Sequence, residues 1–200
     1  MAEKIGKLWI VRRFREAGYA LSAEERAAKM AQVDALRREC AHVLVDANAL
    51  WSGYGVASFG AELYGDIEAL QNHTARLEKM DWFRYVESDT FVGTVVFANE
   101  PAYENPVFQL QFIRGIREAA KALPPERVQA EMQRNAASAE SLGMRRVLRL
   151  DTRWSREGYL WVQILEWPNM EAVMKHIAFE EQQEWPRGVD QTHVLGVKAA

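Results

Sequence analysis

The chain carries one pattern of residues twice, and this repeat limits the folds that it can adopt. Residues 51–95 align without gaps with residues 154–198, and 12 of these 45 positions are identical, whereas ordinary composition would give roughly 3. The identities include two tryptophan pairs and one histidine pair: Trp51 and Trp154, Trp82 and Trp185, His73 and His176. An upstream block, residues 11–30, aligns in the same way with residues 113–132. We therefore predict two tandem units, residues 1–97 and 106–200, joined by a linker at residues 98–105.

Each unit has the same expected order of elements: strand, helix, two strands, helix, strand. In unit one, runs of β-branched and aromatic residues predict strands at 7–15, 41–51, 55–64 and 90–97. Ser22 and Glu25 form a capping box at the start of the first helix, and Asp66 caps the second. Unit two repeats this order, with a first helix that begins at a Pro-Pro pair and a second helix that begins at Asn169.

This order of elements is the ferredoxin-like βαββαβ arrangement, which leaves one face of each sheet without helices. An uncovered apolar face has to be buried, and two copies in one chain can bury it by packing sheet against sheet. The predicted fold class is therefore α+β, with two tandem ferredoxin-like units that form an intrachain dimeric α+β barrel.

Composition excludes several classes of partner. The net charge is −3, with Lys and Arg spread along the chain, so we expect no nucleic acid partner. No apolar run approaches the roughly 20 residues that a membrane span requires, and the charged N-terminus has no signal-peptide core. The single cysteine, Cys40, cannot form an internal disulfide and suits the cytoplasm. No spacing of His, Cys or acidic residues indicates a metal site. A small-molecule ligand and a homo-oligomer are the partners that we expect.

Two stretches of unit two carry a family resemblance. KALPPERVQAEMQRN (residues 121–135) and EWPNMEAVMKHIAFEEQQEW (166–185) resemble the C-terminal unit of the chlorite dismutase-like group. In unit one, ALSAEERAAKM and LEKMDWFRYVESDTFVG are similar to darcynin and to antibiotic-biosynthesis-monooxygenase-like barrels. The resemblance implies the dimeric α+β barrel fold with a small-molecule cavity. Where haem-binding members carry a proximal histidine this chain has Asn135, an unusual iron ligand, which implies that no cofactor is held.

Histidines and alternating polar strand residues provide the candidate site. His73 and His176 lie at the edge of the buried stripe of the second helix in each unit, where an imidazole could act as acid and base or could simply be packed. The candidate catalytic residues are His176, His73, Arg149 and Asp151. The candidate substrate-binding residues are Trp161, Gln163, Gln111, Asn135 and Arg114.

Strand alternation places the polar residues of unit two on one face of its sheet. If this face lines the barrel, Arg149 and its neighbours form a polar pocket there; alternatively, Arg149 pairs with Asp46 and holds the two halves together. The sequence also leaves open a pocket between sheet and helices.

These features favour an enzyme without a tightly bound organic cofactor, acting on an apolar or aromatic metabolite by histidine acid/base chemistry. An isomerase, a lyase or a cofactor-independent monooxygenase would fit. The first alternative is a non-catalytic ligand-binding or structural protein. The second is a haem-dependent oxidoreductase, which requires His176 or His73 to replace the missing iron ligand.

Overall fold

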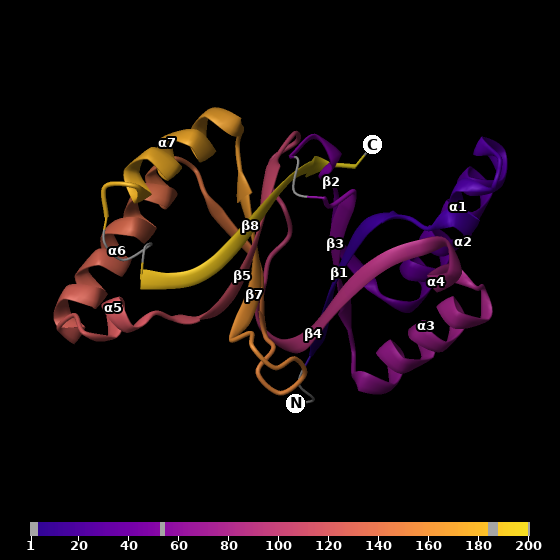
Figure 1. Ribbon diagram of the computed structural model, residues 1–200, viewed down its shortest axis with the longest axis horizontal. Helices are drawn as coiled ribbons and strands as arrows, with labels where there is room; N and C mark the ends of the chain where they lie inside the picture. Colours follow the sequence, from indigo (N-terminus) through magenta and orange to yellow (C-terminus); the bar gives the residue numbers. More distant parts are fainter. Residues whose placement is uncertain (1–3, 53–54, 184–187, 200) are drawn as a thin grey trace.

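The chain folds into a closed barrel of eight antiparallel strands with helices on two opposite sides (Figure 1). The structure, a computed structural model, describes residues 4–52, 55–183 and 188–199. The strand order is β1-β3-β2-β8-β5-β7-β6-β4. The predicted fold class, α+β with two ferredoxin-like units that form one intrachain barrel, is confirmed.

Unit one supplies half of the barrel and the helices on one side of it. Its elements are β1 (Ile5–Phe14), α1 (Glu16–Tyr19), α2 (Ala23–Cys40), β2 (His42–Asn48), the 3₁₀ turn Leu50–Ser52, β3 (Ser58–Tyr64), α3 (Ile67–Lys79), α4 (Trp82–Tyr85) and β4 (Val86–Ala98). The Ser22 side chain accepts a hydrogen bond from the backbone of Glu25, and Asp66 caps α3. The predicted helix starts of this unit are thus confirmed.

Unit two repeats the order on the other side. Its elements are β5 (Val107–Ile116), α5 (Glu118–Lys121), α6 (Pro125–Ser141), β6 (Arg145–Asp151), β7 (Trp161–Trp167), α7 (Met170–Glu180) and β8 (Val189–Lys198). Asn169 caps α7 as predicted. The short helices α1 and α5 lie in connections for which the sequence predicts no helix, and α4 begins at Trp82, the residue at which the sequence predicts the second helix of unit one to end. Trp185, the repeat partner of Trp82, lies outside the described residues.

The barrel closes where the last strand of each unit pairs with a strand of the other. On one side β4 pairs with β6, from Thr94 opposite Asp151 to Ala98 opposite Leu148. On the other side β8 pairs with β2, and within the described residues two pairs join them: Ala47 with Lys198 and Asn48 with Val197. The two units therefore share one continuous sheet and one core.

Apolar side chains from both units fill the barrel. Large, fully buried members come from strands of each half: Leu8, Phe59, Phe108, Leu110, Leu148, Leu150 and Ile164. Their alternation along each strand sends the intervening residues to the outer face, beneath the helices. The expected burial of the uncovered sheet faces thus explains why neither unit needs helices on both sides.

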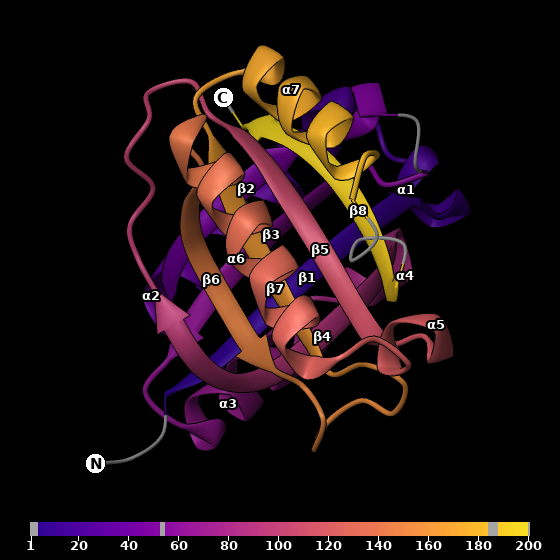
Figure 2. The same ribbon diagram turned by 90° about the vertical axis from the view of Figure 1, so that its left-hand side faces the viewer.

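The polar residues of unit two lie on this outer face. Arg149 and Trp161 alternate with the buried Leu148, Leu150 and Val162, and Figure 2 shows α6 lying across β6 and β7 on this side. Arg149 therefore neither lines the barrel interior nor pairs with Asp46, and both of these predictions are wrong. Asp46 instead lies 2.9 Å from the Arg37 guanidinium of its own unit. Buried leucine and isoleucine on the inner face leave only the helix-covered face for charged groups.

Candidate functional site

A pocket of about 510 Å³ lies between the outer face of the unit-two sheet and helices α6 and α7. Six residues singled out from the sequence line it: Gln111, Asn135, Arg149, Trp161, Gln163 and His176. They come from three strands and two helices, which the fold brings to one place. Between them lie apolar side chains, including Ile113, Val128, Met132 and Leu165. The pocket therefore combines an apolar lining with a few polar groups, as ligand sites commonly do.

The sheet forms a polar wall of this pocket. The register places Gln163 opposite both Gln111 and Arg149 on neighbouring strands. Gln163 Nε2 donates to Gln111 Oε1 at 2.5 Å, and the Arg149 guanidinium lies 4.2 Å from the Trp161 ring centre. This cation–π contact holds the guanidinium and the indole together on one side of the cavity.

Arg149 is a cation without a carboxylate partner in the described parts of the chain. No acidic side chain there comes within ion-pair distance of it, although Asp151 is two residues away. Burial, followed by the nearby Arg146, lowers the pKa of Arg149. A guanidinium is charged at all physiological pH values, so this wall presents a positive charge that no carboxylate among the described residues contacts.

The helices form the opposite, acid–base wall. His176 Nε2 lies 3.4 Å from Glu180 Oε1, one turn along α7, and His176 Nδ1 lies 3.5 Å from Ser138 Oγ on α6. Asn135 Nδ2 donates to Glu180 Oε1 at 3.0 Å. Burial alone would raise the pKa of Glu180, but hydrogen bonds from His176 and Asn135 outweigh it and lower that pKa. Glu180 is therefore a carboxylate held between two donors.

A polar chain behind the pocket supports this wall. Trp167 Nε1 donates to Gln109 Oε1 at 3.0 Å, and Gln109 Nε2 lies 2.7 Å from His193 Nδ1. The His176 ring centre lies 5.1 Å from that of Trp167. Burial lowers the pKa of His193, which favours its neutral form.

Sequence reasoning missed Glu180 and His193. The spacing of Glu180 from His176, four residues along a helix, is a signal that could have found the first. His193 carries no such signal, because its approach to Gln109 depends on the pairing of β5 with β8.

Three other predicted residues lie elsewhere. Asp151, at the end of β6, accepts hydrogen bonds from the Arg153 side chain, including one of 3.0 Å from Nε; this interaction lowers the pKa of Asp151. Arg114 donates to Thr192 Oγ1 at 2.8 Å and lies over the Tyr159 ring. Neither lines the pocket. His73 belongs to unit one.

His73 is fully buried in a charged cluster of unit one. Its Nδ1 lies 2.5 Å from Tyr64 Oη, and Tyr64 donates to Glu62 Oε2 at 2.5 Å. The tyrosine proton is committed to Glu62, so His73 Nδ1 is the donor in its contact, and Nε2 has no partner among the described residues. Burial, with help from the nearby Lys7, lowers the pKa of His73 to about 4. His73 is therefore neutral and packed, without access to the unit-two pocket.

Comparisons with solved structures identify the fold. A point mutant of chlorite dismutase from Candidatus Nitrospira defluvii superposes with a TM-score of 0.74 at 13% identity, over 98% of this chain and 91% of that one. The same enzyme in complex with imidazole gives 0.75 at 13% identity, with coverage of 98% and 91%. A further protein, TA0507, provisionally described as a chlorite dismutase, gives 0.72 at 10% identity, with coverage of 98% and 95%.

The chain therefore has the dimeric α+β barrel fold, in the two-unit form found in chlorite dismutase structures. No protein-family model matches the sequence, and no curated protein matches it significantly. In the described parts of the chain, no helix is long and apolar enough to cross a membrane. The predictions of a cytoplasmic location and of homo-oligomers stay predictions.

The residues of the pocket do not fit a haem group, the cofactor of the haem-binding proteins that unit two resembles. Asn135 stands where the resemblance places the iron ligand, and its amide nitrogen is committed to Glu180. Haem iron is commonly held by a histidine or a thiolate. Among the described lining residues, no cysteine is present, and the imidazole of His176 has one ring nitrogen near Ser138 and the other near Glu180.

Proposed function

We propose that the unit-two pocket binds a small aromatic carboxylate and that the His176–Glu180 pair transfers a proton to or from it. One observation carries this proposal. Arg149, a cation without a carboxylate partner among the described residues, and the His176–Glu180 pair line the same largely apolar cavity. Chlorite turnover, the activity that names the similar structures, is not part of the proposal because the donor set does not supply a haem ligand.

The charge of Arg149 supports a carboxylate ligand. A guanidinium can donate two parallel hydrogen bonds to one carboxylate, and burial strengthens such an interaction because water competes less. Arg149 already lies over Trp161, so an aromatic ring bound through its carboxylate would meet the indole and the apolar side chains of α6. Gln111 and Gln163 offer additional polar contacts.

The helix wall supports proton transfer. Glu180 is held as a carboxylate and can accept a proton, and the adjacent imidazole of His176 can pass a proton on. Both side chains line the cavity. Asn135 fixes the orientation of Glu180, so a bound molecule would meet a positioned acid–base pair. This is the chemistry that an isomerase or a lyase uses at a carbon next to a carbonyl group.

Ligand charge is tested with two matched probes, 1-naphthoate and its neutral amide, by isothermal titration calorimetry. We expect the carboxylate to bind at least about tenfold more tightly, since hydrogen bonds to charged groups are worth more than neutral ones. Arg149→Gln should remove this preference and Arg149→Lys should keep part of it. Arg114→Gln is the control, because Arg114 lies outside the pocket. Equal binding of both probes to the unchanged protein would contradict the proposal.

Proton transfer is tested with phenylpyruvate, an aromatic carboxylate with acidic methylene protons. We expect the protein to accelerate the exchange of these protons for deuterium, followed by NMR, above the rate in buffer. His176→Gln and Glu180→Gln should return exchange to the buffer rate while 1-naphthoate still binds. His42→Gln, an exposed histidine paired with Glu100, should have no effect.

A non-catalytic binding protein is the second candidate, favoured by the near-complete burial of His176. Carboxylate-selective binding with exchange no faster than in buffer would replace the catalytic proposal by this one. A haemin titration tests the third alternative, a haem-dependent oxidoreductase. We expect no shift of the haemin Soret band that depends on His176.

A further inference from the structure

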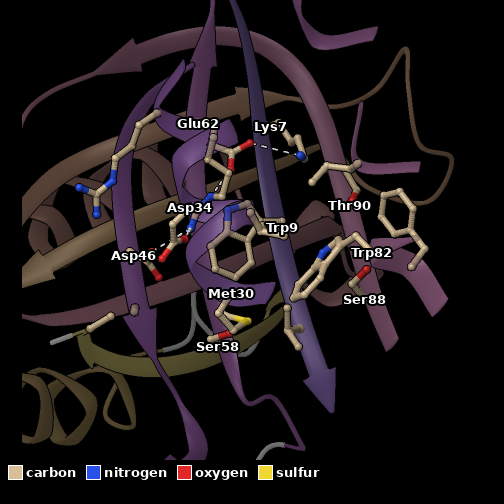
Figure 3. Close-up of a pocket in the computed structure, with 18 of the residues that line it drawn as sticks. Lys7, Trp9, Met30, Asp34, Asp46, Ser58, Glu62, Trp82, Ser88 and Thr90 are labelled. Carbon is tan, nitrogen blue, oxygen red and sulfur yellow. Dashed lines mark hydrogen bonds and ion pairs between the residues drawn. The ribbon is translucent and has the colours of Figure 1, made fainter. Parts of the chain in front are cut away.

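Unit one contains a second pocket, of about 390 Å³, on the outer face of its own sheet. Trp9 on β1 and Trp82 on α4 provide aromatic walls, and Met30 of α2 lies across from the strands (Figure 3). The pocket is the repeat counterpart of the first, since Met30 aligns with Met132 and each methionine lines the cavity of its unit. The duplication thus produced two cavities in one chain.

The two buried cations that line this pocket are already paired with carboxylates, whereas the third lining cation, Arg38, is exposed to solvent. Lys7 Nζ lies 3.2 Å from Glu62 Oε2. Arg37 contacts Glu62 at 2.6 Å, Asp46 at 2.9 Å and Asp34 at 3.0 Å. Every buried cation here faces a carboxylate, in contrast to Arg149 in unit two. A bound carboxylate would add a negative charge beside three existing ones, which is unfavourable in a partly buried site.

Uncharged hydrogen-bonding groups complete the lining. Ser58, Ser88 and Thr90 face the cavity, and within the described residues their hydroxyl groups make no hydrogen bond to protein. A hydroxyl can both donate and accept. The Arg37 guanidinium lies 4.5 Å from the centre of the Trp9 ring, which holds that wall in place. The site therefore offers aromatic surfaces and free hydroxyl groups, and its lining carries as many cations (Lys7, Arg37 and Arg38) as carboxylates.

We propose that this second pocket binds a flat, uncharged aromatic molecule with a hydroxyl or carbonyl substituent. The molecule would lie against Trp9 and Trp82, and its oxygen would contact the hydroxyl groups of Ser58, Ser88 or Thr90. The two halves of the chain would then have diverged from one ancestral cavity into sites of different charge preference, one for neutral aromatic molecules and one for aromatic carboxylates.

The test uses 2-naphthol, which is uncharged at neutral pH, with variants that fill either cavity. Met30 and Met132 are both partly exposed, at 39% and 48%, so replacement by tryptophan should be tolerated by the fold. Met30→Trp should weaken 2-naphthol binding by at least about tenfold, because the new side chain occupies the ligand space. Met132→Trp should leave 2-naphthol binding unchanged. Calorimetry measures binding, and near-UV circular dichroism checks the fold of each variant.

Three further measurements decide the outcome. If Met30→Trp perturbs folding, Phe83→Ala takes its place. This variant removes another lining side chain, at 37% exposure, and should also weaken 2-naphthol binding. Binding of 2-naphthol that survives both unit-one variants would overturn the proposal, and so would tighter binding of 1-naphthoate or 1-naphthylmethylamine at the Met30 site. The Met30→Trp result does not depend on ligand binding in unit two, so failure of either site can be recognised separately.

Discussion

At the scale of single residues, the two histidines show how equivalent positions acquire different roles. His73 contacts Tyr64 within a buried charge cluster, whereas His176 lies beside Glu180 in a pocket. The repeat keeps the imidazole in both helices, but the residues around it have changed: Tyr64 in one unit corresponds to Trp167 in the other. The presence of the histidine therefore does not indicate its function. The residues around each imidazole determine its role.

His73 should make the stability of the protein depend on pH. Its pKa is lowered to about 4 from an ordinary 6.5, so the unfolded chain binds the proton more readily than the folded chain. The free energy of unfolding should therefore be highest above pH 6.5 and fall as the pH is lowered towards 4. In His73→Leu this part of the decline should disappear, as measured by urea unfolding across that range. His42→Gln, at an exposed position, is the control. If the free energy of unfolding depended on pH equally in His73→Leu and the unchanged protein, the assignment to His73 would be contradicted.

At the scale of elements, the first helix of each unit begins differently although its role is the same. In α2, Glu25 N donates to Ser22 Oγ at 3.1 Å and Ser22 N donates to Glu25 Oε2 at 2.7 Å. The repeat partner of Ser22 is Pro124, which caps α6 without a side-chain hydrogen bond. Proline at a helix start fixes the backbone instead. Both solutions position the helix that covers a pocket.

Removing the α2 cap should weaken the fold by a small, defined amount. Ser22→Ala removes the acceptor for the Glu25 backbone and should lower the free energy of unfolding by about 1 kcal/mol. Ser22→Asn supplies another good cap and should restore most of the loss. Urea unfolding of the two variants measures the difference. Equal stability of Ser22→Ala and the unchanged protein would show that tertiary contacts alone fix this helix end.

At the scale of the whole molecule, one glycine pair explains how the barrel closes. Gly93 and Gly196 are repeat partners on β4 and β8, the strands that pair with the other unit. A Cβ at Gly93 would lie 2.6 Å from the backbone oxygen of Asp151, and one at Gly196 would lie 2.7 Å from the Phe59 ring. Both contacts cross between the units, so at these two positions the halves lie too close together to accommodate a side chain.

Side chains at these glycines should therefore destabilise the entire barrel. Gly93→Val should lower the free energy of unfolding by about 1–3 kcal/mol, the usual range for overpacking, and Gly196→Val should also lower it because the Phe59 ring that it meets is fully buried. Because both units share one core, tryptophan fluorescence and far-UV circular dichroism should report a single transition. Gly115→Ala, where a Cβ meets nothing within 4 Å, is the control. Separate transitions for the two probes would contradict a shared core.

The duplication, the order of elements and the helix starts could be predicted from the residues alone. These features are local or repeat at a fixed spacing, so the identities between the units, the Ser22 capping box and the alternation along β6 and β7 could be recognised without coordinates. Alternation also placed Arg149, Trp161 and Gln163 on one sheet face. Of the six candidate residues that line the pocket, Gln111 also lies on this face, whereas Asn135 and His176 reach it from α6 and α7.

The direction in which that face points and the pairing of the charges depend on how the whole chain packs. A strand alternates equally well in either orientation, and the choice depends on the apolar residues of all eight strands filling one interior. The partner of Asp46 is Arg37 because α2 crosses its own sheet there. Arg149 lacks an acidic partner within the described residues because no carboxylate of α6 or α7 reaches it. Such pairings depend on how helices cross a sheet, which residue spacing along the chain does not encode.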